Sequence, residues 1–385
     1  MTNHTHYAQL INEKRTTTVT AFPKISKNLS RRGFIGASAL APAALMLQAG
    51  EAHAAANTRA QLAAVHSGSP AHQLLYKTDE FFIAHRGAGN ISPEHTAYAY
   101  AESVRRGALA VEISVRTTSD GQFVCMHDTN IKRTTGASMD VRGHTLAELR
   151  QHKVNMRKNL GEKTDLYDIP TLEEAIAAIN AVPAGGEYAS VGGKKVVLFL
   201  EAKDGPAQAG LVKFITERGL QRRTVIKMYR DGNGGFKPTS KYLKLANSAG
   251  CATWCYFDGG DPIDKISAMA RHENVDAIGV PYYEKPTGAS HGSMSEENVR
   301  TLTGLGKAVI VWEIHRRSAY EKYKALGVKG FMCPDPYWVI GDPFDASVKI
   351  KTGQRPHGML PADPSVAADM PDLTGAAIVH NQRYD

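Results

Sequence analysis

Short hydrophobic runs alternate with amphipathic stretches along most of the chain, beginning near residue 81 and ending near residue 334. The runs are rich in β-branched and aromatic residues, which is typical of buried strands. Nine runs have this character: residues 81–85, 109–115, 122–127, 195–202, 224–228, 253–257, 277–281, 308–314 and 330–334. Strands that alternate with helices in this way predict parallel strands joined by crossover helices.

Helix signals stand between several of these runs. After Pro170, Thr171 is followed three residues later by Glu174, a capping-box pattern that predicts the start of a helix. Six helices are predicted in all: residues 96–106, 171–180, 207–217, 240–249, 295–305 and 319–326. Each lies between two hydrophobic runs, which supports a succession of βα units.

Residues 80–342 have the length of an eight-fold barrel, and we predict a single-domain (β/α)8 TIM barrel there. Nine runs are one more than a barrel needs. The tight turn at Ser119-Asp120-Gly121 predicts that the second and third runs pair as a hairpin. A doubly wound open sheet is the alternative fold. It usually carries a Gly-rich phosphate turn after its first strand, of which Gly87-Ala88-Gly89 is only a fragment.

The two ends of the chain differ from this pattern. Residues 1–54 hold the pair Arg31-Arg32 before an Ala-rich apolar stretch, and they end in a small-residue cleavage pattern, Ala52-His53-Ala54. This is typical of a twin-arginine export signal, so we expect cleavage near Ala54 and a periplasmic or secreted protein. Residues 55–79 have the character of a polar leader segment with a short helix. The Pro- and Gly-rich residues 343–385 predict an irregular C-terminal tail.

Composition and charge narrow the function. The chain has 385 residues, of which 42% are hydrophobic and 22% charged, enough apolar material for a globular core. Half of the formal net charge of +8 belongs to residues 1–54. The remainder is ordinary for a chain of this length, so it favours a small anionic substrate and gives no case for nucleic acid. The apolar stretch before Ala54 is broken by Pro42 and shorter than the roughly 20 residues of a spanning helix, so we expect no stable membrane anchor.

The four cysteines give a weaker signal. Cys251 and Cys255 are spaced like metal ligands, but no second cysteine or histidine pair accompanies them. Cys125 and Cys333 lie inside apolar runs, which favours buried free thiols. An exported protein can oxidise its cysteines, so the pairing of the four stays open.

Polar side chains gather at the ends of the predicted strands. In a (β/α)8 barrel the carboxyl ends of the strands meet at one face, where active sites form. Residues two apart on a strand point the same way, so Glu112 lies beside Ser114 and Glu201 beside Lys203. The candidate site residues are His85, Arg86, Glu94, Glu112, Ser114, His127, Glu201, Lys203, Trp312 and Glu313.

These residue types favour one kind of chemistry. Leaving the carboxylates of Glu112 and Glu201 unpaired inside a barrel is costly, and one divalent cation with oxygen ligands, Mg²⁺ or Ca²⁺, would offset that cost. Arg86 and a neighbouring lysine suit phosphate oxygens. His85 and His127 titrate near neutral pH, so one can take a proton from a nucleophile while the other gives one to a leaving oxygen. Together they predict phosphodiester cleavage.

Each of these residues also has a structural interpretation. Either histidine could be a core residue that bonds to a backbone carbonyl. Glu112 could pair with Arg86, Lys203 could pair with Glu201, and Glu94 could cap the helix that follows it. The arrangement as a whole, with so many polar residues at one end of the strands, favours the site over these separate explanations.

Several short motifs follow one another in a particular order: Ala84-His85-Arg86-Gly87-Ala88, Pro93-Glu94-His95-Thr96, Val111-Glu112-Ile113-Ser114-Val115, Met126-His127-Asp128, Arg133-Thr134-Thr135-Gly136, Ile169-Pro170-Thr171-Leu172-Glu173-Glu174-Ala175, Leu200-Glu201-Ala202-Lys203 and Val311-Trp312. In this order they resemble the glycerophosphodiester phosphodiesterase family, across residues 80–340. The resemblance implies a (β/α)8 barrel that hydrolyses glycerophosphodiesters, small-molecule substrates, to glycerol phosphate and an alcohol.

The resemblance also implies a role for each site residue. His85 and His127 would be the acid–base pair, and Arg86, Lys203 and Trp312 would bind substrate. One divalent cation would be held at the positions of Glu112, Ser114 and Glu201, with Glu94 in or beside its shell. The family has Asp where this chain has Ser114, so the site carries one negative charge fewer, and Glu313 is our candidate to replace the missing acid. His95 stands where the family has Asn.

Two other functions remain open at this point. A related phospholipase or sphingomyelinase-type lipid phosphodiesterase would need an exposed apolar rim, which Pro281-Tyr282-Tyr283 and Tyr337-Trp338 could supply. A non-catalytic, phosphodiester-binding relative would need a metal site that has decayed through Ser114. The retained pair of histidines argues against the second of these.

Overall fold

The computed structural model describes residues 68–89, 91–160, 164–185, 192–283, 292–314, 317–334 and 336. All of them belong to one of the two units into which the chain divides, Arg59–Asp385. The predicted export signal, the predicted tail and the pair Tyr337-Trp338 lie outside the described residues. No helix of the described part is long and apolar enough to cross a membrane.

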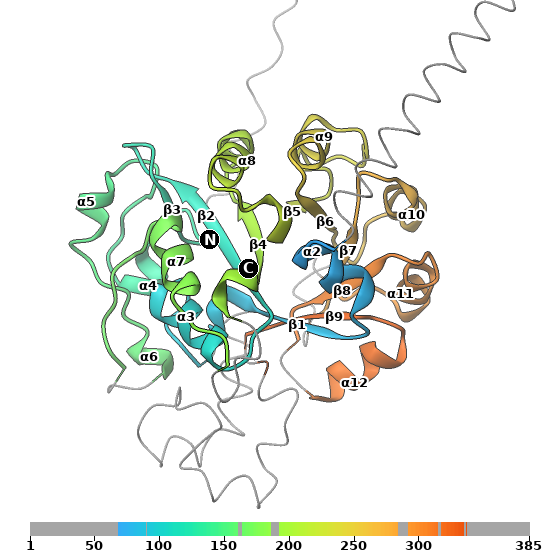
Figure 1. Cartoon of the computed structure of the whole chain (residues 1–385), viewed down its shortest axis with the longest axis horizontal. Helices are drawn as coiled ribbons and strands as arrows, with labels where there is room; N and C mark the ends of the chain where they lie inside the picture. The colour runs from blue at the N-terminus through green and yellow to red at the C-terminus, as the bar shows by residue number, and fades with distance from the viewer. Residues whose placement is uncertain are drawn as a thin grey trace, which may run out of the picture. The chain divides into compact units, whose positions relative to one another are not determined.

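Nine strands form one sheet that closes on itself. They are β1 (Phe81–Ala84), β2 (Ala110–Thr117), β3 (Phe123–Cys125), β4 (Val197–Ala202), β5 (Thr224–Tyr229), β6 (Ala252–Tyr256), β7 (Ala277–Pro281), β8 (Ala308–Trp312) and β9 (Gly330–Cys333). The order is β1-β9-β8-β7-β6-β5-β4-β2-β3, and β1 also pairs with β2. The eight strands other than β3 are therefore a closed parallel barrel, which confirms the predicted fold (Figure 1).

The extra strand is the predicted hairpin partner. β3 runs antiparallel to β2, with Val115 opposite Cys125, and the turn at Gly121 joins the two. Gly121 adopts a positive φ of 79°, a conformation that glycine takes without a steric penalty. The tight turn in the sequence therefore identified the one strand that does not belong to the barrel.

Helices surround the strands, as Figure 1 shows. The helices and helical turns of the described residues are α2 (Pro70–His72), η1 (Gln73–Lys77), η2 (His85–Gly87), α3 (Ala97–Arg105), α4 (Lys132–Thr135), α5 (Leu146–Leu149), α6 (Arg157–Leu160), α7 (Leu172–Asn180), η3 (Gly193–Lys195), η4 (Gly205–Ala207), α8 (Gln208–Glu217), η5 (Gln221–Arg223), α9 (Lys241–Ser248), α10 (Ile263–Arg271), α11 (Glu296–Thr303) and α12 (Arg317–Ala325). All six predicted helices are present, and the capping box at Thr171 is formed, because its hydroxyl accepts from Glu174 N at 3.1 Å.

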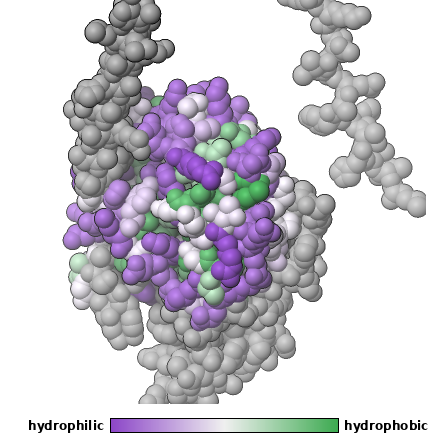
Figure 2. All heavy atoms as spheres, turned by 90° about the vertical axis from the view of Figure 1, so that its right-hand side faces the viewer, coloured by the Kyte–Doolittle hydropathy of each residue, from purple (hydrophilic) through white to green (hydrophobic). Residues whose placement is uncertain are grey.

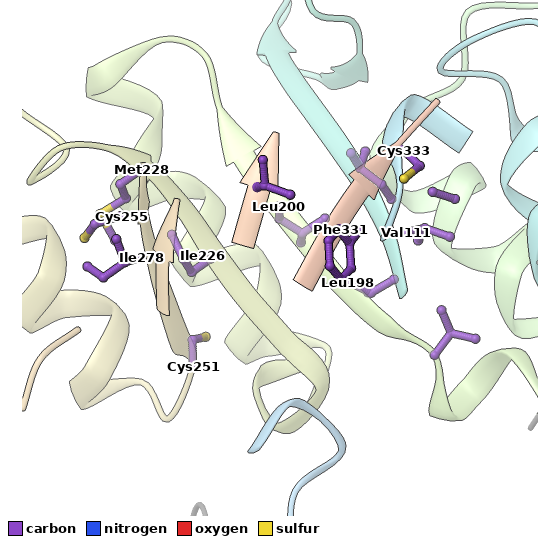
Figure 3. Close-up of a cluster of buried hydrophobic side chains, with 14 of the residues drawn as sticks. Val111, Leu198, Leu200, Ile226, Met228, Cys251, Cys255, Ile278, Phe331 and Cys333 are labelled. Carbon is purple, nitrogen blue, oxygen red and sulfur yellow. The ribbon is translucent and has the colours of Figure 1, made fainter. Parts of the chain in front are cut away.

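Alternation along the strands divides the hydrophobic side chains into two clusters. On β4, Leu198 and Leu200 belong to the outer cluster that packs against the helices, part of which is drawn in Figure 3. Val197 and Phe199 belong to the inner cluster within the barrel, together with Leu75 of η1. Successive side chains of a strand point to opposite faces, so the next inward position after Phe199 is Glu201.

A small third core follows β3. The described residues between 126 and 170 include the short helices α4, α5 and α6, and apolar side chains of this segment, among them Met126, Ile131 and Leu149, pack as a separate cluster. None of these three short helices is predicted from the sequence. The insertion matters for the site because α4 carries Arg133.

Two further features concern one face of the surface and the four cysteines. The face turned to the viewer in Figure 2 is mostly hydrophilic, with a small group of hydrophobic residues in its middle. Cys125, Cys251, Cys255 and Cys333 are all buried and form no disulfide with one another, which confirms the expectation of buried thiols for Cys125 and Cys333.

Candidate active site

The inward positions of neighbouring strands change from apolar to polar at one level of the barrel. Ala110 faces inward on β2 and is followed at that face by Glu112 and Ser114, while on β4 Glu201 lies directly opposite Ser114 in the register. Ser114 Oγ donates to Glu112 Oε1 at 2.9 Å. The structure thus brings together the predicted residues of these two strands at the carboxyl ends of the barrel.

A lysine that the sequence analysis does not identify lies between the two glutamates. Lys227 of β5 places its Nζ 3.2 Å from Glu112 Oε1 and 2.9 Å from Glu201 Oε2. A signal for it exists in the sequence, because Lys227 is a charged residue inside an apolar run and has the parity of the inward-facing Val225. Such a residue is expected either to be paired or to belong to a site.

Charge pairing keeps all three of these groups ionised. Burial alone would raise the pKa of Glu112 and of Glu201, but the cations outweigh it. Lys227 holds the pKa of Glu112 well below its ordinary range, and Lys203 with Lys227 lowers that of Glu201 to about 2. Burial would lower the pKa of Lys227, yet the two carboxylates raise it above its ordinary value.

The loop after β1 brings in a further ion pair. Glu94 is buried and accepts two hydrogen bonds of 2.7 Å from Arg133, and Arg86 Nη1 lies 3.6 Å from its Oε1. Burial would raise the pKa of Glu94, but these two cations lower it well below the usual range. Arg86, Ala88 and His95 adopt positive φ values of 53°, 65° and 57°. Such conformations are costly for side-chain-bearing residues and persist where the surroundings fix them.

The backbone of the same loop reaches Glu112. Arg86 N donates to Glu112 Oε2 at 3.2 Å, so the main chain of this loop helps to hold the carboxylate. Lys203 Nζ lies 3.3 Å from Glu201 Oε2, as its spacing predicts. The guanidinium of Arg86 and the ammonium of Lys203 are the cations that the sequence assigns to phosphate, and both act on His127 electrostatically.

Each predicted catalytic histidine has a carboxylate at Nδ1. Glu313 contacts His85 Nδ1, and Asp128 Oδ1 lies 2.9 Å from His127 Nδ1. Because an ionised carboxylate only accepts hydrogen bonds, Asp128 keeps a proton on Nδ1 of His127, which leaves the lone pair on Nε2 at the other side of that ring. Glu313 lies on the Nδ1 side of the His85 ring, so Nε2 is the nitrogen of His85 that faces away from the carboxylate. Arg133 Nε donates to Asp128 Oδ2 at 2.7 Å and so fixes the second carboxylate in turn.

Burial and neighbouring cations set the protonation state of His127. Burial lowers its pKa well below the ordinary value, and Arg86, Lys203 and Lys227 lower it further. Its side chain is nonetheless 15% exposed, so substrate can reach it. His127 is therefore a neutral imidazole at neutral pH, in the state that a general base requires.

An aromatic wall completes the described part of the site. Trp312 packs edge-on against Tyr256 with ring centroids 5.4 Å apart, and Tyr256 donates to Glu201 Oε1 at 2.6 Å. The indole Nε1 of Trp312 is buried and has no hydrogen-bond partner within the part of the chain that the structure describes. A buried donor of this kind can serve a polar ligand.

The divalent cation predicted from the sequence does not fit this donor set. An ammonium joins Glu112 to Glu201, a guanidinium binds Glu94, and the hydroxyl of Ser114 donates into Glu112. Among the described residues, no group of three or more His, Cys, Asp or Glu side chains is placed to hold a metal ion. A doubly charged ion about 4 Å from an ammonium would be repelled by roughly 8 kcal/mol at an effective dielectric of about 20.

Two imidazoles beside carboxylates and several cations at one mouth of a (β/α)8 barrel suit the hydrolysis of a phosphodiester, and the relatives of this chain are phosphoric diester hydrolases. The family model described as "Glycerophosphoryl diester phosphodiesterase family" matches residues 85–225. A glycerophosphodiester phosphodiesterase of Bacillus subtilis is 38% identical over 258 residues, which are 64% of this chain and 81% of the relative. The chain belongs to the glycerophosphodiester phosphodiesterase family.

Other relatives agree with this assignment. A glycerophosphodiester phosphodiesterase of Caldanaerobacter subterraneus is 25% identical over 264 residues, which are 67% of this chain and 95% of the relative. A solved phosphodiesterase from Oleispira antarctica, in complex with the product sn-glycerol-3-phosphate, shares the fold with a TM-score of 0.51 and 19% identity, covering 68% of this chain and 95% of that one. The family generally depends on divalent cations.

Proposed function

We propose that the chain hydrolyses glycerophosphodiesters to glycerol phosphate and an alcohol, with His85 and His127 as its acid–base pair. The observation that carries this proposal is the matched support of the two imidazoles, each with a carboxylate at Nδ1. Family membership supports the substrate class.

Binding comes first in the reaction. Arg86 and Lys203 are buried or half-buried cations at the mouth of the barrel, and they pair with the two anionic oxygens of the phosphodiester. The Trp312 ring forms a wall against which the glycerol or alcohol portion lies, and its Nε1 donates to a substrate oxygen. These contacts hold the phosphorus near both imidazoles and lower the entropic part of the barrier.

Proton transfer follows from the state of the two rings. His127 Nε2 takes the proton of the glycerol hydroxyl next to the phosphate, and that oxygen bonds to phosphorus. The bond from phosphorus to the alcohol oxygen breaks as His85, which enters this step with a proton on Nε2, gives that proton to the leaving oxygen. Water then opens the cyclic phosphate with the two roles reversed, so one water is consumed overall. No step uses the Mg²⁺ or Ca²⁺ ion predicted from the sequence, because Lys227 lies between two of its predicted ligands.

The alternative functions receive less support. Tyr282 packs edge-on against Tyr323, and Tyr283 packs edge-on against Trp312, with ring centroids 5.5 Å and 6.0 Å apart. Both tyrosine rings therefore pack against other aromatic side chains, Tyr282 at the outer cluster and Tyr283 at Trp312, which does not favour the exposed apolar rim of a lipid hydrolase. The intact pairing of both imidazoles with carboxylates disfavours a non-catalytic relative.

Turnover of glycerophosphocholine tests the proposal, with glycerol phosphate and choline measured as products. His85→Ala and His127→Ala should each lower kcat at least about a hundredfold, because general acid or base catalysis is worth roughly 10²–10⁴. His144→Ala is the matched control, since His144 lies in the insertion and contacts Asp140 O. The proposal is wrong if the wild-type protein cleaves no glycerophosphodiester, or if it cleaves phosphatidylcholine or sphingomyelin vesicles in preference.

We further propose that the chain is exported by the twin-arginine route. Support comes from the sequence alone, from Arg31-Arg32 ahead of the apolar stretch and the small-residue pattern that ends at Ala54. Replacing both arginines with lysine should leave the uncleaved chain in the cytoplasm of the producing cell, as measured by fractionation and N-terminal sequencing. Export of the doubly substituted chain at the wild-type level would contradict the proposal.

A further inference from the structure

We propose that this site works without a resident divalent cation, because the ammonium of Lys227 takes the place between Glu112 and Glu201 that such a cation would occupy. Lys227 is then a positioning residue: it fixes both carboxylates and adds a permanent positive charge beneath the bound phosphate. The kinetic part of this inference rests on the proposed function, whereas its metal-binding part does not.

The position of Lys227 is fixed by its surroundings. Its side chain is only 8% exposed, and it rises from an inward position of β5. The Nζ of Lys227 lies 5.1 Å from the centre of the Tyr256 ring and 5.6 Å from the centre of the Trp254 ring. The ammonium is therefore contacted by aromatic rings as well as by the two carboxylates. Cation–π contacts of this kind stabilise a buried ammonium.

The oxygens of both carboxylates already accept hydrogen bonds or ion pairs. Glu112 Oε1 accepts from Ser114 and Lys227, and its Oε2 accepts from Arg86 N. On the other carboxylate, Oε1 accepts from the Tyr256 hydroxyl and Oε2 from the ammonium groups of Lys203 and Lys227. A cation that needs six or more oxygen ligands at roughly 2.0–2.6 Å would have to displace several of these donors at once.

The net charge of the site explains why a serine at position 114 is compatible with a lysine at position 227. Three carboxylates around a divalent cation leave one net negative charge, and two carboxylates around one ammonium leave the same charge. A carboxylate in place of Ser114 would add a third buried anion beside Lys227 without a second cation to balance it. The serine hydroxyl instead donates into Glu112, so the two residues make one consistent, metal-free arrangement.

The wild-type protein provides the first test. After dialysis against EDTA, it should retain turnover of glycerophosphocholine within about twofold, and elemental analysis should find far less than one equivalent of metal. Millimolar MgCl₂, CaCl₂ or MnCl₂ should leave its melting temperature unchanged within about 1 °C, since a ligand that binds only the folded state would raise it. A saturable rise, or activity lost to EDTA and restored by one of these cations, would overturn the inference.

A pair of variants provides the second test. Lys227→Met should lower kcat by about a hundredfold, because it removes a preorganised positive charge near the phosphate, and Lys213→Met on the exposed face of α8 is the matched control. In Ser114→Asp/Lys227→Met, three carboxylates face an empty centre, so millimolar Mg²⁺ or Ca²⁺ should raise the melting temperature by about 5 °C and restore part of the lost turnover. A merely structural lysine would not produce rescue by a divalent cation.

The outcomes separate this inference from the proposed function. If no diester is cleaved, the proposed function fails, while melting curves and metal analysis still decide the role of Lys227. If Lys227→Met does not fold, the wild-type measurements and Lys227→Arg, which keeps the charge, decide instead. A double variant that folds and binds no cation would show that the place between the glutamates is not a metal position, and it would overturn the inference.

Discussion

At the scale of single residues, carboxylates decide how the imidazoles of this site are used. Glu313 and Asp128 each occupy the Nδ1 side of one ring, which leaves Nε2 as the working nitrogen. The sequence analysis assigns Glu313 to a metal shell, while the structure places it against His85. That assignment stays a prediction for a metal-bound state, and the contact that is present indicates a positioning residue.

Replacing that carboxylate should reduce the rate more than binding. In Glu313→Gln the side-chain amide can donate to Nδ1 and so favour the wrong tautomer of His85. We expect kcat for glycerophosphocholine to fall about 10- to 100-fold with KM nearly unchanged. Glu217→Gln, at an exposed position of α8, is the control and should behave like the wild type. A wild-type kcat in Glu313→Gln would show that Glu313 has no part in the reaction.

The pH dependence should report the surroundings of His127. Burial and three neighbouring cations hold its pKa well below the ordinary value, so the ring stays neutral on acidification until the pH falls through that lowered pKa. Protonation of His127 should therefore remove no activity between pH 8 and pH 6, so kcat/KM should show no acid limb there, whereas a base with a pKa of about 6.5 would lose about three quarters of its activity by pH 6.

A variant tests which groups lower the pKa of His127. Lys203→Met removes one of the cations that lower the pKa of His127, so the acid limb of the kcat/KM profile should move to higher pH. The position of the limb is measured separately from the height of the profile, which also falls because Lys203 binds phosphate. An acid limb already near pH 6.5 in the wild type would contradict the assignment of His127 as the initial base.

The sequence allows the polar ends of the strands to be predicted, but not every partner. His85, Glu112, His127 and Glu201 are recognisable because motif order and strand parity place them at one mouth. Arg133 reaches Glu94 from an insertion 39 residues further along the chain, and no local pattern encodes that contact. The place of Lys227 in the site is not predicted either, because no motif surrounds this single lysine in an apolar run.

At the scale of elements, the junction between α7 and β4 leaves no space for an added side-chain atom at Gly193. A Cβ on Gly193 would lie 1.6 Å from the carbonyl oxygen of Ile179 at the end of α7. No side-chain rotation relieves this overlap, because both groups belong to the backbone. Gly193→Ala should therefore lower the free energy of unfolding by about 3 kcal/mol or more, as measured by urea denaturation.

Gly205→Ala is the matched comparison for that prediction. Gly205 opens η4, and a Cβ there would meet nothing within 4 Å. Its substitution should leave stability unchanged or raise it by about 0.5 kcal/mol, because alanine restricts the unfolded chain. Equal effects of the two substitutions would show that the α7–β4 junction is looser than the structure indicates.

The elements themselves follow the sequence where hydrophobic alternation is strong. All nine strands form, and β7 has the predicted ends, Ala277 and Pro281. α10 was not predicted because Pro262 precedes it and offers no capping side chain. The short helices α4, α5 and α6 were missed for another reason: each spans four residues, too few for a helical period to show in the sequence.

At the scale of the whole barrel, stability and chemistry occupy opposite ends of the strands. The inner cluster fills the amino-terminal part with Phe199, Trp254 and Ile310, and the segment α2–η1 adds Leu75 to it. The charged residues lie at the carboxyl ends. This separation lets one end be packed tightly while the other keeps buried charges that hydrophobic packing would not tolerate.

Truncating a side chain at the packed end should therefore change stability without changing catalysis. Leu75 is 1% exposed, and Leu75→Ala should lower the free energy of unfolding by about 2–5 kcal/mol. Leu245, which is 37% exposed on α9, is the control, and Leu245→Ala should stay within about 0.5 kcal/mol of the wild type. At a temperature well below melting, both variants should keep the wild-type kcat/KM. A large loss of kcat/KM in Leu75→Ala alone would show that the packed end and the active-site end of the barrel are coupled, because Leu75 belongs to the inner cluster and the charged residues lie at the other end of the strands.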